Sequence, residues 1–247
     1  MLQPIYEEQV LRELRDWQRQ MLRSPSFTNR LAKRVQQKIN TIIPEKVQQV
    51  ITATIKHMIR AVLFGAEFTT RTPTYNHSLE MREAIIRERI EFFKKTAAAE
   101  GGITGAGGIL LGLADFPLLL GLKLKMLYDI AALYGYNVSD YKERIYLLYI
   151  FQLAFSSQEQ RTHIYRQIVN WEKQKHNLPD DIHQFDWRTF QQEYRDYIDL
   201  AKMAQLIPII GAPVGAVVNY RLLDKLGRFA MNAYRMRWLD ERNKSEA

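Results

Sequence analysis

Hydrophobic residues recur every three or four positions along most of the chain, which is the spacing that places them on one face of an α-helix. The first such stripe consists of Val10, Leu11, Leu14, Trp17 and Met21. Ser24-Pro25 follows it, and this pair is typical of a helix start, because serine caps a helix and proline suits its first position. The pattern therefore predicts one helix before Ser24 and another after it.

The same spacing predicts helices through the rest of the chain. The expected segments are a basic helix after Pro25, a helix from Pro44 to about Gly65, and helices over about 79–98, 117–135, 141–155, from Ser157 onward, and 214–238. Loops are expected at 69–78 and about 176–186. On the exposed face of 79–98, the pairs Glu83–Arg87 and Glu91–Lys95 are interpreted as weak contacts of about 0.2–0.5 kcal/mol each. No segment alternates as a β-strand does, so the sequence predicts an all-α protein.

Two segments, which we call the apolar windows, depart from this pattern. The first, residues 101–122, has Asp115 as its single charged residue, and the second, residues 203–220, has none. Together the windows hold nine of the 12 glycines. Because proline interrupts a helix, we expect Asp115 to cap a helix that starts at Pro117. The prolines that we expect to break the second window are Pro208 and Pro213.

The spacing of the glycines suggests why they gather in the windows. Glycine inside a helix costs about 1 kcal/mol relative to alanine, so a structural benefit must offset that cost. Glycines four residues apart share one helix face and let a second backbone approach closely. The pairs with this spacing are Gly101–Gly105, Gly108–Gly112 and Gly211–Gly215. We therefore expect a multi-helix bundle with two Gly/Pro-interrupted apolar helical hairpins packed at its centre, within one chain or between the copies of a homo-oligomer.

Insertion into a membrane is the alternative interpretation of the windows. As continuous helices, segments of this size would be about 27–33 Å long, which is close to the thickness of a bilayer core. The prolines argue against continuous helices, and short broken apolar runs are more common in protein cores. The sequence alone leaves both interpretations open.

The chain has a net charge of +8, most of which lies in the first quarter. Residues 1–60 hold 11 basic and five acidic side chains. A basic patch of the second helix would contact anionic lipid or other phosphate groups, and it consists of Arg30, Lys33, Arg34 and Lys38. More basic residues follow the windows, namely Lys123, Lys125, Arg221, Lys225 and Arg228, and they favour contact with the inner leaflet of a membrane. A solvated helix face is the alternative interpretation of the patch.

The sequence contains no recognised catalytic or metal-binding motif. Cysteine is absent, and the five histidines lack the spacing of a metal site. We therefore predict no metal, no cofactor and no catalytic residue. A pocket, if one forms, would be lined by Asp115, Tyr128, Asp129 and Tyr220. A helix cap explains Asp115 more simply than a catalytic acid does, and Asp129 is expected to be ion-paired.

Several segments in combination resemble the EcsC family. They are Gly101–Gly108, Leu113–Pro117, Ile130–Tyr136 and Ile209–Ala216, and the resemblance covers nearly the whole chain. We expect a single domain over 1–247, with basic amphipathic helices in 1–66 and glycine-rich apolar sections in 79–136 and 187–238. The resemblance implies a link to an ABC-type transporter, because EcsC-like proteins are encoded beside a transporter of the Ecs kind in Gram-positive bacteria. It implies no catalytic residues.

Patterning, charge and resemblance together favour a non-enzymatic, membrane-associated accessory or regulatory protein. Its expected location is cytoplasmic, peripheral at the inner face of the cell membrane, and its expected partners are anionic lipid and a membrane transporter. A hydrolase with a pocket near Asp115 is the first alternative. A nucleic-acid binder is the second, and it is disfavoured because the sequence has no helix-turn-helix signature and no pattern of stacking aromatic and basic residues.

Overall fold

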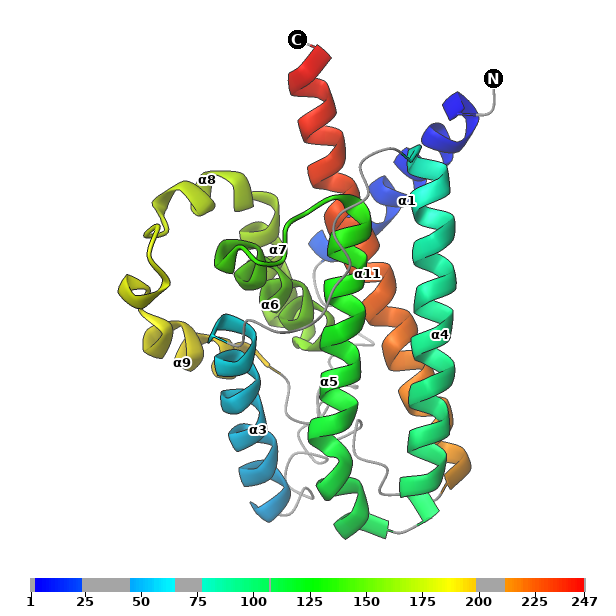
Figure 1. The fold of residues 1–247 in the computed structure, drawn as a ribbon, viewed down its shortest axis with the longest axis vertical. Helices are drawn as coiled ribbons and strands as arrows, with labels where there is room; N and C mark the ends of the chain where they lie inside the picture. The colour runs from blue at the N-terminus through cyan, green and yellow to red at the C-terminus, as the bar shows by residue number, and fades with distance from the viewer. Residues whose placement is uncertain (1–2, 24–44, 65–76, 107, 199–211, 247) are drawn as a thin grey trace.

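The computed structural model describes residues 3–23, 45–64, 77–106, 108–198 and 212–246. Its helices are α1 (Gln3–Leu22), α3 (Glu45–Phe64), α4 (Leu79–Ala106), α5 (Gly108–Tyr134), α6 (Tyr141–Phe155), α7 (Gln158–Val169), α8 (Trp171–Asn177), the 3₁₀ helix η1 (Ile182–Gln184), α9 (Trp187–Tyr197) and α11 (Ala212–Glu246) (Figure 1). Within these ranges no strand occurs, apart from one isolated antiparallel bridge between Ser156 and Ile198. The predicted all-α class is confirmed.

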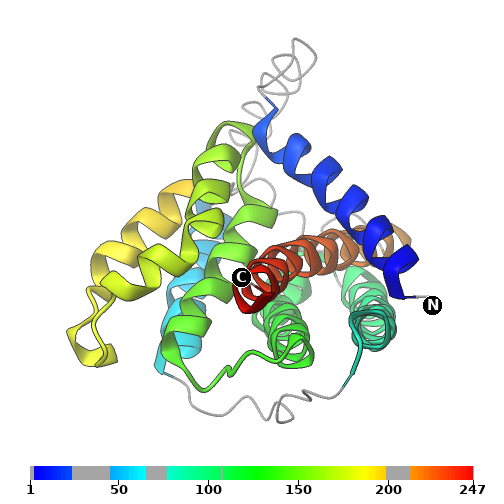
Figure 2. The same cartoon turned by 90° about the horizontal axis from the view of Figure 1, so that it is seen from above.

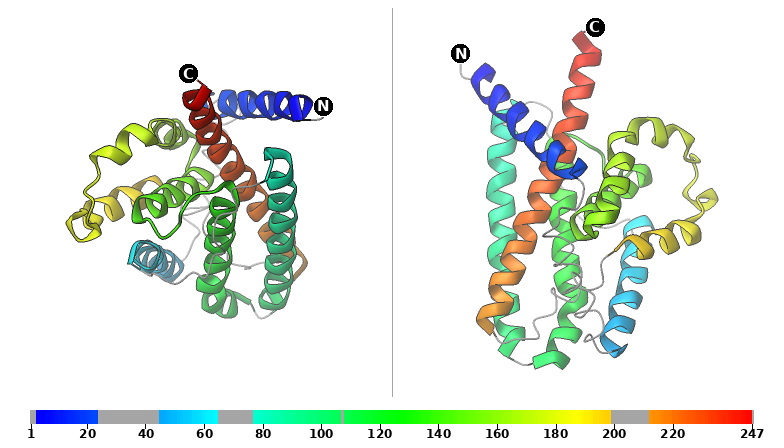
Figure 3. Two further views of the ribbon diagram at one scale, coloured as in Figure 1. Left: turned by 45° about the horizontal axis from the view of Figure 1, so that its top comes forward. Right: turned by 180° about the vertical axis from the view of Figure 1, so that it is seen from behind.

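Three long helices form the centre of the bundle. α4 and α5 run side by side in opposite directions, and α11 packs against both, most extensively against α4. Seen from above, α11 lies among α4, α5, α6 and α1 (Figure 2). α1 crosses the face that α4 and α11 form, whereas α3 and α9 lie on the far side of α5 from α4 (Figure 3). The chain therefore folds as a multi-helix bundle.

Local sequence signals set several helix ends. Gly135 ends α5 with a φ of 101°, a conformation that favours glycine because it has no Cβ. The Gly135 N–H donates to the Ala132 carbonyl and the Tyr136 N–H to the Ala131 carbonyl, each over 3.0 Å. These bonds form a Schellman motif. At the start of α7, the Ser157 hydroxyl accepts from the backbone N–H of Gln160 at 3.3 Å, as predicted.

Some predicted boundaries are wrong. α5 begins at Gly108 and continues through Pro117, so Asp115 does not cap a helix that restarts there. Proline removes one backbone donor, at a cost of about 3 kcal/mol in a helix interior, but packing of α5 against α4 and α11 can offset a local cost of that size. α4 also extends to Ala106 and α11 to Glu246, and both helices run beyond the apolar stripes that predicted them.

Burial follows the predicted stripe in α1, where Val10, Leu14, Trp17 and Met21 all lie in the core.

The prediction of two central hairpins has no such test. Most of the second window, residues 203–211, lies outside the described residues, and so does the predicted loop up to residue 76. The expectation that the chain forms a single domain with three sections also stays a prediction.

Candidate functional site at the apolar end of the bundle

The described parts of the two windows meet at one end of the bundle. The last charged residue of α4 is Glu100, and α11 has no charged residue before Arg221. In Figure 1, the end of α4, the start of α5 and the start of α11 all lie at the bottom, opposite the two termini. We call this region, residues 101–106, 108–122 and 212–220, the apolar end.

The single acid of the apolar end lies at its border. Glu100 lies six residues before the end of α4 at Ala106, and Asp115 lies seven residues after the start of α5 at Gly108. Because the two helices are antiparallel, these two residues lie at a similar height, and residues 101–106 and 108–114 form a tip without charge. At 1.5 Å per residue the tip is about 10 Å deep. Asp115 is partly exposed, so it is not an acid buried in an apolar core.

Large apolar side chains are exposed beside this tip. Leu118 on α5 is 54% exposed and Val217 on α11 is 50% exposed. Isolated exposed aliphatic residues are common on protein surfaces. Here they adjoin a charge-free segment on two neighbouring helices, and this combination suits contact with an apolar phase.

An ionic cluster closes the α4–α11 interface above the apolar end. Lys94 Nζ lies 2.9 Å from Asp224 Oδ1 and 2.9 Å from Glu91 Oε2, and 4.3 Å from the centre of the Tyr220 ring. The Tyr220 hydroxyl donates to Glu91 Oε1 at 3.0 Å. Burial lowers the pKa of Lys94, but the hydrogen bonds with Asp224 and Glu91 outweigh it and raise that pKa above its usual range. The expected pairing of Glu91 with Lys95 is therefore corrected, because Lys94 faces α11.

Lys123 lies fully buried in the α5–α11 interface. Its Nζ donates to the Leu119 carbonyl at 3.1 Å and to Asn219 Oδ1 at 3.4 Å. No carboxylate is among these partners, and burial lowers the pKa of the amine to about 7. The Asn219 amide nitrogen is also buried, with no hydrogen-bond acceptor. The expectation that Lys123 contacts the membrane surface is therefore wrong, since its position lies on the buried stripe of α5.

Three of the four residues of the predicted pocket have separate partners. Tyr128 directs its hydroxyl to the Val62 carbonyl on α3, at 3.4 Å, and burial raises its pKa to about 12. Asp129 pairs with Arg89 at 3.3 Å and with Lys125, as expected. Tyr220 belongs to the Lys94 cluster. The pocket near Asp115 stays a prediction.

Two other sets of predicted residues have no structural test. The basic patch of Arg30, Lys33, Arg34 and Lys38 lies outside the described residues, and so does Gly211. The remaining glycines of the predicted pairs, namely Gly101, Gly105, Gly108, Gly112 and Gly215, lie within described helices, but their side-chain surroundings are not described. Close packing at these glycines therefore stays a prediction.

A close helix contact does occur at a glycine that the pair analysis missed. A Cβ on Gly227 of α11 would lie 2.8–2.9 Å from three side-chain carbons of Ile90 on α4. Such a contact is shorter than carbon atoms tolerate, so a Cβ at this position would force Ile90 or one of the two helices to move. The sequence signal for this contact was Gly227 itself, a lone glycine inside the apolar stripe of α11.

A buried ionic network at the opposite end was also missed. Glu83 on α4 is fully buried and accepts hydrogen bonds from Arg235 at 2.6 and 2.8 Å and from the Tyr134 hydroxyl at 2.9 Å. Its predicted contact with Arg87 exists, at 3.1 Å, but it is not part of an exposed face. A second buried pair joins Arg237 to Glu143. These residues join α4, α6 and α11, and the geometry indicates a structural role.

Among the described residues, no three metal-ligating His, Cys, Asp or Glu side chains come together. No helix in the described ranges is both long enough and apolar enough to cross a membrane.

Comparison with known proteins assigns the chain to a family. A model of the EcsC protein family matches residues 8–239. The chain is 44% identical to Protein EcsC of Bacillus subtilis (strain 168) over 233 residues, which cover 94% of this chain and 96% of that protein. It is 26% identical to the uncharacterized protein YdbA of the same organism over 258 residues, which cover 96% and 94% of the two chains. No solved structure matches it significantly. The chain belongs to the EcsC protein family.

Proposed function

We propose that the protein is a non-enzymatic accessory or regulatory protein that binds the cytoplasmic face of the cell membrane through its apolar end and acts on an ABC-type transporter. The observation that carries the proposal is the charge-free tip, residues 101–106 and 108–114, with Leu118 and Val217 exposed beside it. The transporter partner follows from the EcsC resemblance alone.

The depth of the tip fits one leaflet. The hydrocarbon core of a bilayer is about 30 Å thick, so a tip of about 10 Å reaches into a single leaflet without crossing it. Insertion to a depth of about 5–10 Å is usual for proteins that lie in the interface. Full burial of an exposed leucine or valine side chain contributes about 1.5–3 kcal/mol, so Leu118 and Val217, which are already about half buried, would contribute roughly half of that each. Binding of this kind is reversible.

Basic residues above the tip would add to the attraction. Lys95 on α4 and Arg221 on α11 are exposed at the border of the apolar end. A basic side chain near an anionic surface contributes about 1 kcal/mol. The patch of Arg30, Lys33, Arg34 and Lys38 would act in the same way if it faces the same membrane.

Flotation with lipid vesicles tests the apolar end. We expect the parent protein to float with vesicles that contain phosphatidylglycerol, and Leu118→Glu with Val217→Glu to abolish flotation, because a charge near the tip opposes insertion. Val169→Glu is the matched control, since Val169 on α7 is 49% exposed and lies outside the apolar end. Equal flotation of the double variant and the parent would refute the proposed contact.

A second arm tests the basic patch. Reversal of all four charges, Arg30→Glu, Lys33→Glu, Arg34→Glu and Lys38→Glu, should weaken binding to anionic vesicles and reduce its salt dependence. Binding to vesicles of phosphatidylcholine alone should change little. If the quadruple variant binds anionic vesicles as the parent does, the patch is a solvated helix face.

A further inference from the structure

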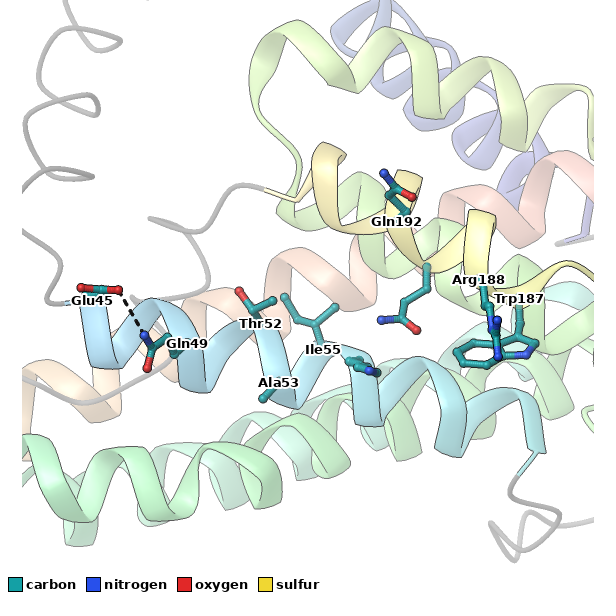
Figure 4. Close-up of a pocket in the computed structure, with 10 residues that line it drawn as sticks. Glu45, Gln49, Thr52, Ala53, Ile55, Trp187, Arg188 and Gln192 are labelled. Atoms are coloured by element: carbon teal, nitrogen blue, oxygen red, sulfur yellow. Dashed lines mark hydrogen bonds between the residues drawn. The ribbon is translucent and has the colours of Figure 1, made fainter.

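A groove of about 1060 Å³ separates α3 from α9 (Figure 4). α3 contributes Glu45, Gln49, Thr52, Ala53, Ile55 and Lys56, and α9 contributes Trp187, Arg188, Gln191 and Gln192. Its volume is that of a ligand site rather than of a packing defect. The groove lies on the far side of α5 from α4, and it belongs to neither the apolar end nor the buried ionic network.

One end of the groove is positively charged. The guanidinium of Arg60 lies 5.8 Å from the centre of the Trp187 ring, and that of Arg188 lies 5.6 Å from it. Lys56 lines the groove one helical turn before Arg60. Among the described residues, no carboxylate forms an ion pair with these three cations. Asp186, next to Trp187 in the chain, accepts a hydrogen bond from the backbone N–H of Thr189 at 3.1 Å, and its charge also interacts with Arg188. With Lys56, Arg60 and Arg188 beside it, this end keeps an excess of positive charge.

The rest of the groove combines polar side chains with apolar ones, Ala53 and Ile55 among them. Its middle carries the amide side chains of Gln49, Gln191 and Gln192 and the Thr52 hydroxyl, which together provide donors and acceptors. At the other end lies Glu45, which accepts from Gln49 Nε2 at 3.2 Å (Figure 4). From Glu45 to Lys56 along α3 the distance is about 16 Å. An extended peptide of about five residues has this length.

We infer that the groove binds the carboxyl-terminal segment of a peptide in an extended conformation, with its carboxylate at Lys56, Arg60 and Arg188. Guanidinium groups bind carboxylates through charge-assisted hydrogen bonds. The glutamine amides suit a peptide backbone, which offers a donor and an acceptor at each residue. The negative charge of Glu45 suits the amino end or a basic side chain. The inference does not depend on the proposed membrane contact.

Two-dimensional NMR tests the inference with penta-alanine, in forms with a free carboxylate and with a carboxyl-terminal amide. We expect the free form to shift the indole resonance of Trp187 and the side-chain amide resonances of Gln49, Gln191 and Gln192. Amidation should weaken binding at least about tenfold, because it removes the charge that the three cations recognise. Inorganic phosphate is the competing probe for an anion site without peptide recognition.

Variants complete the test. Lys56→Glu with Arg188→Glu should abolish the shifts that the free peptide causes, whereas Lys173→Glu, which changes an exposed residue of α8, should preserve them. Circular dichroism melts would verify that each variant is folded, and Gln191→Leu provides a milder change in the middle of the groove. The inference is refuted if millimolar free peptide causes no shift, if the reversed variant binds it equally, or if phosphate reproduces the glutamine shifts. Equal binding of the amidated peptide would also refute it.

Discussion

The buried amine of Lys123 makes the stability of the protein depend on pH. In an unfolded chain the pKa of lysine is about 10.4, whereas burial lowers the pKa of Lys123 to about 7 in the folded protein. Between these values the unfolded chain binds a proton that the folded protein does not. The free energy of unfolding therefore rises with pH across this window, and the dependence disappears below about pH 7, where both states are protonated.

We expect urea unfolding of the parent protein to show increasing stability from about pH 7 to about pH 9, with a slope of up to about 1.4 kcal/mol per pH unit. Lys123→Met keeps the length of the side chain and removes the amine, so this variant should be more stable at neutral pH and lose most of the slope. Lys95→Met, which changes an exposed lysine of α4, should keep the parent's slope. A flat profile for the parent would mean that folded Lys123 retains its proton.

Sequence reasoning identified the charged residues with local partners and missed those whose partners are distant. The pairing of Asp129 was predictable because Lys125 lies one helical turn away. Glu83 and Lys123 were assigned to surfaces, although each occupies a position on the apolar stripe of its helix, between residues such as Leu79 and Ile86 or Leu119 and Leu127. The sequence did carry a signal for the burial of these two residues, namely a charged residue on an apolar stripe. It could not identify their partners on α11, because no local pattern specifies how α11 packs.

At the scale of helices, replacement of glycine by alanine should have opposite effects on stability at two positions. Gly227→Ala should destabilise the protein, because the new Cβ would lie 2.8 Å from Ile90 and overpacking costs about 1–3 kcal/mol. Gly121→Ala should stabilise it by up to about 1 kcal/mol, since no atom lies within 4 Å of the new Cβ and alanine favours the helix. Thermal melts of the two variants measure both effects.

A compensating change strengthens this test. Ile90→Ala shortens the side chain that blocks the new methyl group, so Gly227→Ala should cost less in that background than in the parent. If Gly227→Ala instead stabilises the parent protein as much as Gly121→Ala does, α4 and α11 are not held at the distance that the structure gives.

Periodicity predicted most helices but not how far they extend. The helix over 141–155 has the predicted bounds, because a cap at Asp140 and a continuous apolar stripe coincide there. Pro117 led to an incorrect break in α5. The cost of a proline is local, whereas the packing that offsets it comes from residues far away in the chain. Local signals therefore failed where tertiary contacts of α4 and α11 decide the outcome.

At the scale of the molecule, the separation of charge would give the proposed membrane contact a fixed orientation. The apolar end lies at the bottom of Figure 1 and both termini lie at the top. From Val217 to Lys244, α11 extends about 40 Å. The proposed insertion would thus hold the end of α11 well outside the bilayer. Composition indicated the two windows, but only the packing of α11 against α4 and α5 brings their described parts together.

This orientation is measurable because the chain has no cysteine, so one introduced thiol can carry a label. A fluorophore at Leu118→Cys should be quenched by lipids with brominated acyl chains. The same label at Lys244→Cys, at the other end of the molecule, should not be quenched. Equal quenching at both positions, or quenching only at residue 244, would contradict the proposed orientation.

The most extensive partner of α4 is α11, which is synthesised after all the other described helices. About 110 residues separate the end of α5 from the end of α11. At roughly 5–20 residues per second, the face of α4 that α11 covers stays open for about 5–20 s in each growing chain. A nascent chain thus exposes this face of α4, beside the charge-free tip, before α11 exists. A chain that stops before α11 keeps this face exposed, and it should aggregate or be degraded rather than act as a smaller version of the protein.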